Sequence, residues 1–312
     1  MRERWAHELA ARAADHWTDA RVAALTGGKA LPITPRDAPL LLRALGLLRS
    51  DASMPPAQVR KFLQINHVVR MLEPPLRELR ERHATIHLLD AGCGRSYLTL
   101  LLAWVAKHRW GHPVHVLGVD RNAALVEECR RRTEIAELSD VVRFVAAPLA
   151  GLDLAAAWGA AFGAPQVIHG VCALHACDTA TCDAIALGVE LGVDLIAVAP
   201  CCQAELARAW ATAGTTGAFA PIWRAGHLRR EVGAHLTDAM RVLLLRAAGY
   251  EATAAEFVAA HHSAKNTLVR AVRPRAPDHA ERAVAWAEYR ALVEATGGHG
   301  LALAARLPGG VP

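Results

Sequence analysis

Short apolar runs alternate with stretches of helical spacing from residue 87 onward. This alternation is typical of buried parallel strands whose connecting helices cover both faces of one sheet. We therefore predict an α/β fold with a seven-stranded, mostly parallel, doubly wound sheet. The predicted strands are 86–90, 114–120, 141–146, 166–173 and 193–199, with a last pair near 255–261 and 266–272. The predicted helices between them include 97–108, 122–133, 179–191 and 231–248.

The first 82 residues show helical spacing alone and form a predicted N-terminal helical region. Its last helix, over about 57–71, is expected to stop near Glu73-Pro74-Pro75, because proline lacks the N–H that a helix interior uses. Two earlier helical segments cover 3–25 and Pro35 to Leu48. We expect three regions, which are the helical region 1–82, an α/β domain over 83–275, and a C-terminal helix and tail over 276–312.

The net charge of +5 at pH 7 is unevenly distributed. Residues 1–82 hold 14 Lys and Arg against 9 Asp and Glu, whereas residues 83–312 hold 21 of each. A basic helical region beside a neutral domain favours an anionic partner, with RNA as the first candidate. Ordinary solvated helix faces are the alternative explanation for so small an excess.

The cysteines and the apolar runs indicate a reducing compartment and no membrane partner. Seven cysteines at irregular spacing do not form a disulfide framework. No apolar run approaches the ~20 residues of a membrane span, and the first residues lack the apolar core of a signal peptide. We therefore expect a cytoplasmic protein. No metal is expected, because zinc ligands often come in C-x-x-C pairs and the candidates lack one. These candidates are His175, Cys177, Cys182, Cys201 and Cys202.

Residues 87–95 carry the most informative pattern of the chain. A predicted strand ends at Asp90, Gly92 and Gly94 follow, and a helical pattern begins at Tyr97. The glycines permit backbone angles and close approach that a side chain forbids, and the helix start offers free N–H groups to a polar ligand. This segment predicts a nucleotide-cofactor turn.

Two kinds of cofactor turn share this pattern. In the dinucleotide fingerprint G-x-G-x-x-G, a third glycine lets the helix pack closely on the strand, but Tyr97 stands in that place here. Asp90 would repel a pyrophosphate, whereas it would accept a hydrogen bond from a cationic amino group. S-adenosylmethionine carries an ammonium and no phosphate. The turn resembles motif I, D-x-G-x-G, of the class I S-adenosylmethionine-dependent methyltransferases, which implies a Rossmann-like methyltransferase sheet and makes 83–275 the methyltransferase domain.

The next predicted strand supports the same interpretation. It ends in Asp120, 26 residues past Gly94, where this fold places a carboxylate against the two ribose hydroxyls. Ala147 and Pro148 follow the third strand and are expected to line the adenine slot. The full set of expected cofactor residues is Asp90, Gly92, Cys93, Gly94, Asp120, Arg121, Ala147, Pro148 and Gln64.

A second resemblance is more specific. Residues 172–183, Cys-Ala-Leu-His-Ala-Cys-Asp-Thr-Ala-Thr-Cys-Asp, resemble the L-H-A-C-[DG]-x-A-T-D element of a methyltransferase branch that includes eukaryotic tRNA ribose methyltransferases and a group of bacterial relatives. Cys182 departs from that pattern, because it splits the final Thr-Asp pair. Pro200-Cys201-Cys202 matches the P-C-C of the same branch. The resemblance extends over roughly 55–273 and includes 235–241 (His-Leu-Thr-Asp-Ala-Met-Arg), Gly249-Tyr250 and 265–270.

The resemblance implies a methyl acceptor beside His175, Asp178 and the two cysteines. His175 is the expected general base for a ribose hydroxyl, and Asp178 would orient that imidazole or the substrate. Alternatively, Asp178 or Thr179 caps the helix 179–191. Cys201 or Cys202 would attack C6 of a pyrimidine in a covalent mechanism, or both would only shape the pocket.

Two polar pairs complete the expected site. Arg60 and Lys61 precede the turn, and Lys61 with Gln64 resembles the K-x-x-Q pattern of the relatives; these side chains would bind a substrate phosphate or the cofactor carboxylate. Lys265 and Asn266 would close over the substrate backbone. The sequence thus predicts an S-adenosylmethionine-dependent methyltransferase that modifies tRNA or rRNA by direct in-line transfer. The alternatives are a small-molecule methyltransferase, a Cys-dependent pyrimidine C5 methyltransferase, or an RNA-binding protein that keeps the cofactor fold without catalysis.

Overall fold

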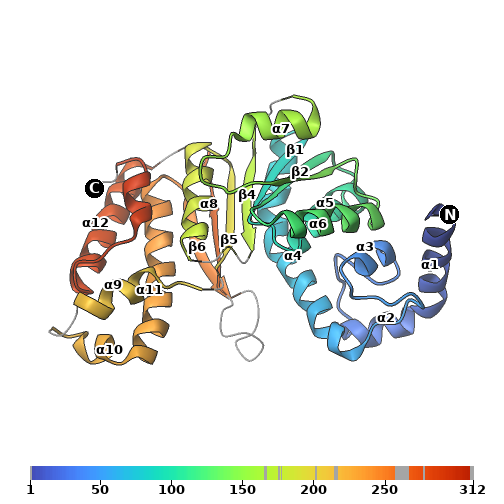
Figure 1. Ribbon diagram of the computed structural model, residues 1–312, viewed down its shortest axis with the longest axis horizontal. Coiled ribbons are helices and arrows are strands. Elements are labelled where there is room, and N and C mark those ends of the chain that lie inside the picture. The colour runs from blue at the N-terminus through green and yellow to red at the C-terminus, as the bar shows by residue number, and fades with distance from the viewer. Residues whose placement is uncertain are drawn as a thin grey trace. The chain divides into compact units, whose positions relative to one another are not determined.

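The computed structural model describes the chain except for residues 1, 165–166, 175, 177, 201, 214–216, 257–266, 277 and 310–312. Seven strands form one mixed sheet in the order β3-β2-β1-β4-β5-β7-β6 (Figure 1). This order confirms the expected α/β class. The strands are β1 (Ile86–Ala91), β2 (Val114–Asp120), β3 (Val142–Ala146), β4 (Gly170–Leu174), β5 (Leu195–Ala199), β6 (Glu251–Glu256) and β7 (Thr267–Val272).

Most strand pairs are parallel, as the sequence predicts. β1 with β2, β2 with β3, and β4 with β5 are parallel, whereas β7 runs antiparallel to both β5 and β6. β6 begins at Glu251 instead of near residue 255. The reason is local: the backbone of Gly249 has a φ of +95°, which turns the chain directly from the preceding helix into the strand. The rest of the strand expected at 255–261 lies outside the described residues.

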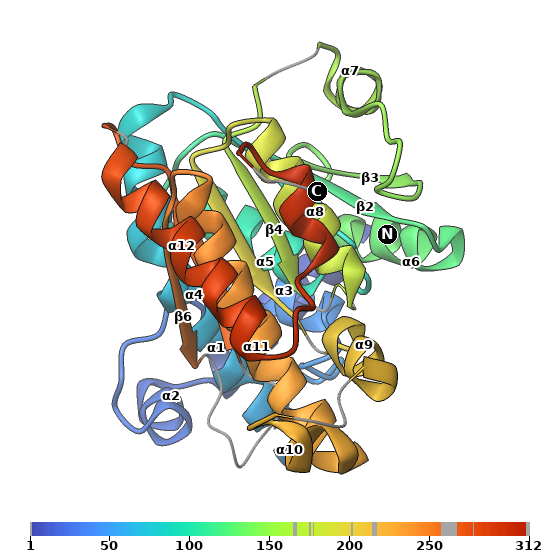
Figure 2. The same ribbon diagram turned by 90° about the vertical axis from the view of Figure 1, so that its left-hand side faces the viewer.

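Contacts divide the chain into two compact units, Met1–Val167 and Ile168–Pro312. In the C-terminal unit, α11 (Gly226–Ala247) and α12 (His279–Ala295) lie side by side (Figure 2). The N-terminal unit holds α1 (Arg2–His16), α2 (Asp19–Thr26), α3 (Pro39–Ala44), α4 (Pro56–Arg82), α5 (Tyr97–Trp104) with a π-helical end over Val105–Arg109, α6 (Ala123–Ile135) and α7 (Leu154–Phe162). The C-terminal unit holds α8 (Thr179–Glu190), α9 (Glu205–Ala213), α10 (Ala220–Arg224), α11 (Gly226–Ala247), α12 (His279–Ala295) and a 3₁₀ turn over Ala302–Arg306.

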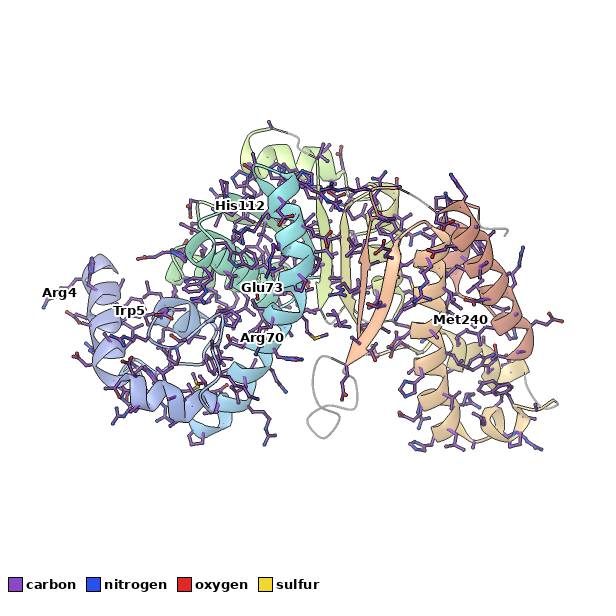
Figure 3. The ribbon with its side chains drawn as sticks, turned by 180° about the vertical axis from the view of Figure 1, so that it is seen from behind. Arg4, Trp5, Arg70, Glu73, His112 and Met240 are labelled. Carbon is purple, nitrogen blue, oxygen red and sulfur yellow. The ribbon has the colours of Figure 1, made fainter. Side chains whose placement is uncertain are left out.

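The predicted stop of the third helix at Glu73 is wrong. α4 runs without a break through Pro74 and Pro75 for 27 residues, and Figure 3 shows Glu73 on the same continuous helix as Arg70. Leu72, Leu76 and Leu79 lie fully buried on both sides of the prolines. Burying three leucines contributes about 1.5–3 kcal/mol each, which is of the same order as the ~3 kcal/mol or more that each of the two interior prolines costs.

The second helix is shorter than expected. α3 ends at Ala44 because Gly46 takes a left-handed φ of +71°, and Leu47 and Leu48 then donate their N–H groups back to the carbonyl of Leu42. The leucines beyond the helix remain buried, so their apolar spacing reflects packing of a turn. Within the described ranges, no helix is long and apolar enough to cross a membrane.

Gly118 offers a test of how tightly β2 packs. It is the register partner of Phe144 on β3, and a Cβ atom at this position would lie 2.5 Å from two ring carbons of Phe144. We expect Gly118→Ala to destabilise the protein by about 1–3 kcal/mol through overpacking, seen as a lower Tm in thermal unfolding. Gly226→Ala is the control, because its Cβ would meet only the ends of two arginine side chains. Equal melting of Gly118→Ala and the unchanged protein would contradict this packing.

Candidate cofactor and acceptor sites

The turn between β1 and α5 has the geometry of a ligand cradle. Gly92 and Gly94 have φ values of +76° and +52°, which strain any L side chain. The N–H groups of Gly92 and Cys93 both donate to the carbonyl of Val119, at 2.8 and 3.0 Å. The turn is thereby fixed to the end of β2.

Asp120 joins three segments at the end of β2. Its carboxylate accepts the N–H of Gly94 at 2.9 Å on one oxygen and the N–H of Asn122 at 2.9 Å on the other. Its carbonyl accepts the N–H of Ala147 at 3.0 Å, which brings the segment of Ala147 and Pro148 to the same place. Each carboxylate oxygen keeps a second lone pair, so Asp120 fits two ribose hydroxyls.

Asp90 is a buried carboxyl that has a hydroxyl for its partner. Thr99 of α5 donates its hydroxyl to Asp90. Burial, with a smaller effect from the negative charge of Asp120, raises the pKa of Asp90 from 3.8 to about 6. A cation beside Asp90 would favour its ionised form. Asp90 therefore fits the ammonium of the expected cofactor. Its position just before the first glycine of the turn predicts the same role.

Thr99 and Cys129, which the sequence did not single out, also support the turn. Cys129 of α6 donates its thiol to the carbonyl of Gly94 at 3.1 Å, and Thr99 holds Asp90. A hydrogen bond with Cys129, together with burial, raises the pKa of Cys93, so Cys93 stays a neutral thiol. Thr99 stands alone as a polar residue in the apolar run Leu98–Ala103, which is the signal that would have found it.

One of the polar residues expected before the turn, Lys61 of α4, contacts the first residue of α5. The Lys61 ammonium lies 3.7 Å from the centroid of the Tyr97 ring, and the Tyr97 hydroxyl donates to the carbonyl of Leu45. Tyr97, which stands where the dinucleotide fingerprint has its third glycine, is therefore held to α4 by a cation–π contact. Arg60 and Arg121 are exposed and Gln64 is half-buried, so each remains accessible to a ligand.

The residues expected around the methyl acceptor belong to the C-terminal unit, where the structure describes Asp178 and Cys202. Cys202 is a half-buried reduced cysteine. His175, Cys201, Lys265 and Asn266 lie outside the described residues, so their predicted roles stay predictions. In the described part of the chain, no three His, Cys, Asp or Glu side chains gather as metal ligands.

The side chain of Asp178 does not cap α8, against the alternative drawn from the sequence. It caps α9 instead: one oxygen accepts the N–H groups of Ala204 at 2.8 Å and Glu205 at 3.2 Å, and the other pairs with Arg208. Burial alone would raise the pKa of Asp178, but the Ala204 N–H and the Arg208 guanidinium outweigh it and lower the pKa below its ordinary value.

A buried polar network joins α11 to this region. Gln203 donates its amide to both oxygens of Asp238 at 3.1 and 2.9 Å. Arg241 donates to Asp238 at 3.1 Å and to the carbonyl of Asp178 at 2.8 Å. The sequence of segment 235–241 contributes to a family resemblance but predicts no role for these side chains.

Comparison with known proteins identifies the domain. Residues 60–209 match the family model of a methyltransferase domain. This range includes the cofactor turn, Asp120, Asp178 and Cys202. The chain therefore contains a methyltransferase domain, for which S-adenosylmethionine is the methyl donor. The finer motif branch stays a prediction, and no curated protein matches the chain.

Solved structures show weaker similarity. The chain is similar to an rRNA methylase from Streptococcus thermophilus, with 12% identity, 66% of this chain and 97% of that chain covered, and a TM-score of 0.39. It is also similar to the human methyltransferase 10 domain containing protein (12% identity, 76% and 94% covered, TM-score 0.41). A third is a geranyl diphosphate methyltransferase in complex with SAM (14% identity, 68% and 90% covered, TM-score 0.35). The acceptors in these names belong to those proteins.

The buried carboxyl of Asp90 predicts opposite effects on binding and stability. Because its pKa is raised from 3.8 to about 6, the folded protein binds more protons than the unfolded chain between these values, and stability falls as the pH rises through them. Asp90→Asn removes this cost and keeps an acceptor for Thr99. We expect a higher Tm than the unchanged protein at pH 8, with the advantage gone below pH 4.

The same variant should lose cofactor affinity. Losing a hydrogen bond to a charged group costs about 1.5–3 kcal/mol, so calorimetry with S-adenosylmethionine should show about 10- to 100-fold weaker binding at pH 8. Asp140→Asn, which changes an exposed partner of Lys107, is the control with unchanged affinity. Unaltered affinity of Asp90→Asn would show that Asp90 does not hold the ammonium.

Proposed function

We propose that this chain methylates RNA, either tRNA or rRNA, by direct in-line transfer. The observation that carries the proposal is the cradle of Gly92, Gly94 and Asp120, whose carboxylate is held by the turn it faces. A cradle of this kind suits a nucleoside with free ribose hydroxyls. A tRNA or rRNA substrate would place the activity in the cytoplasm.

Within this proposal, each of the expected site residues has one role. The cofactor supplies an electrophilic methyl group on its sulfonium. Asp90 accepts a hydrogen bond from the ammonium, and Asp120 accepts hydrogen bonds from the two ribose hydroxyls. Ala147 and Pro148 line the adenine ring. His175 removes the proton of the acceptor hydroxyl, which has a high pKa and gains from a base near neutrality. The remaining assignments are Cys93, Arg121 and Gln64 on the cofactor, and Lys265 and Asn266 on the RNA backbone.

The exposed face of α4 supports RNA as the acceptor. Arg60, His67, Arg70 and Arg77 recur at spacings that keep them on one side of the helix, and all four are exposed. Among the described residues, none of the three arginines forms an ion pair. We call these four residues the α4 basic stripe. Guanidinium groups in such a row suit successive phosphates.

A small-molecule acceptor, the first alternative, would need a pocket beside the cofactor turn. In the N-terminal unit, a cavity of about 500 Å³ lies against β3, α6 and α7, and its lining includes Arg130, Arg143 and Ala157. Neither Asp90 nor Asp120 lines it. The covalent alternative depends on a thiolate at Cys201 or Cys202. Separate Cys→Ala variants would distinguish it, because one of the two would abolish a covalent reaction by removing its nucleophile, whereas direct transfer would survive both.

The test is transfer of tritiated methyl groups to bulk tRNA and rRNA from cells that lack the gene. We expect label in one RNA class, with RNA binding that weakens steeply with salt. Incorporation into no RNA at all, by protein that binds S-adenosylmethionine, would overturn the proposal.

The α4 basic stripe makes a second prediction. The triple variant Arg60→Glu, Arg70→Glu, Arg77→Glu should weaken RNA binding at least tenfold and reduce the slope of log affinity against log salt by about 2 to 3, because three phosphate contacts are lost. S-adenosylmethionine affinity should not change. The matched control reverses three exposed arginines of the C-terminal unit, Arg224, Arg230 and Arg290. Equal effects of the two triple variants would show only a general charge effect.

A further inference from the structure

We propose that Asp178, Gln203, Asp238 and Arg241 form a clamp that holds the loops after β4 and β5 in one arrangement and thereby positions the methyl acceptor. The inference rests on the proposed function and deepens it. It also assigns Asp178 a positioning task in place of the catalytic one that the sequence suggests. We call these four residues the acceptor-loop clamp.

The two loops are joined directly at Asp178. Its backbone N–H donates to the carbonyl of Cys202 at 2.9 Å, so the end of the His-Ala-Cys-Asp segment is tied to the Pro-Cys-Cys segment. Its side chain also accepts the N–H groups of Ala204 and of Glu205, the first residue of α9. One residue of the first loop thus holds three positions of the second segment, which are Cys202, Ala204 and Glu205.

The backbone of Asp178 is strained in this position. Its φ of +54° and ψ of −116° lie outside the regions that an L residue favours. A conformation of this kind costs about 1–3 kcal/mol and persists where the surrounding contacts over-determine it. The side-chain and main-chain hydrogen bonds of Asp178 supply those contacts, and they would be lost if the loops separated.

The carboxylate of Asp178 is poorly suited to accept a proton. Two N–H groups and the Arg208 guanidinium already donate to it, and they favour its charged form. A general base works best with a pKa near the operating pH. Asp178 is therefore held as a structural anion, while the proton of the acceptor hydroxyl is left to another group.

α11 reaches both loops from a single helical turn. Arg241 donates to the carbonyl of Asp178 in the first loop, and Asp238 accepts from Gln203 in the second. The two α11 residues also pair with each other at 3.1 Å, with the Arg241 side chain 1% exposed and that of Asp238 9% exposed. Both loops are therefore set by one rigid element.

The energetics favour a geometric role for this pair. Taking an arginine and an aspartate out of water costs several kcal/mol for each ion, and apolar residues of similar volume often give equal or greater stability. A buried ion pair gives little net stability, but it imposes fixed distances and directions. Ligands of parallel sheets bind beyond the carboxyl ends of the strands, and the loops in the clamp leave the ends of β4 and β5.

The decisive experiment compares Asp178→Ala with Asp178→Asn. The amide keeps an oxygen for the N–H groups of Ala204 and Glu205 and cannot act as a base. If Asp178 only positions the loops, the Asp178→Asn variant should keep kcat within about fivefold, because only the ion pair with the exposed Arg208 is weakened. Asp178→Ala should lower kcat about 100-fold, as a displacement of about 1 Å does, with S-adenosylmethionine affinity unchanged.

The matched control is Asp183→Ala. Asp183 lies on α8, the helix that follows Asp178, and its carboxylate also pairs with an arginine, Arg306 at 2.5 Å. Among the described residues, this carboxylate forms no hydrogen bond to either loop. Its loss should leave kcat unchanged. If Asp178→Asn lost as much activity as Asp178→Ala, Asp178 would be a catalytic base and the clamp would be overturned.

A second measurement reads the clamp without activity. Hydrogen exchange of the Ala204 and Glu205 amides should accelerate at least tenfold in Asp178→Ala and in the conservative variant Arg241→Lys, and stay slow in Asp178→Asn. Unchanged protection in Asp178→Ala would overturn the clamp. If the unchanged protein methylates no RNA while these amides respond as expected, the RNA proposal fails and the clamp stands as a device for another acceptor.

Discussion

The candidate cofactor site depends on one interaction, the hydrogen bond from the Gly94 N–H to the Asp120 carboxylate. It connects the turn after β1 to the end of β2, and the carbonyl of Asp120 extends the connection to Ala147 after β3. Three consecutive strand ends are thereby set by one residue. Gly94 is required there because its φ of +52° brings the N–H to the carboxylate. A cofactor would meet a surface whose polar groups are already oriented, so little ordering would accompany binding.

Two buried or half-buried aspartates show how neighbours decide what a carboxyl does. Asp90 is fully buried with one hydroxyl donor, and burial raises its pKa to about 6. Asp178 is less buried, and its backbone donors and Arg208 lower its pKa. Among the described residues no cation pairs with the first carboxyl, which is suited to receive one from a ligand. The second has its cation already and serves the fold of its loops. Sequence alone cannot separate these cases, because both residues simply follow or end an apolar strand.

The strands and the cofactor turn were predictable because they depend on local pattern. β1, β2 and β5 lie within a residue or two of their expected bounds, since apolar runs bounded by Gly and Asp report burial directly. The course of α4 was not predictable, because leucines buried beyond Pro74 and Pro75 overrule a local signal. The contacts of Asp178, Asp238 and Arg241 join residues up to 63 positions apart, and no spacing rule announces them. Cys129 was missed for the same reason, because its contact with Gly94 spans 35 positions.

The unbroken α4 places a restriction on how this chain can change in length. Lys61 lies on the Tyr97 ring near one end of the helix, and Leu76 and Leu79 are buried near the other. Each inserted or deleted residue would rotate one end against the other by about 100°, since a turn holds 3.6 residues. Lys61 and the leucines would then face wrong directions together. Evolution can lengthen this region before Pro56 or after Arg82, whereas the helix between them is confined to one length.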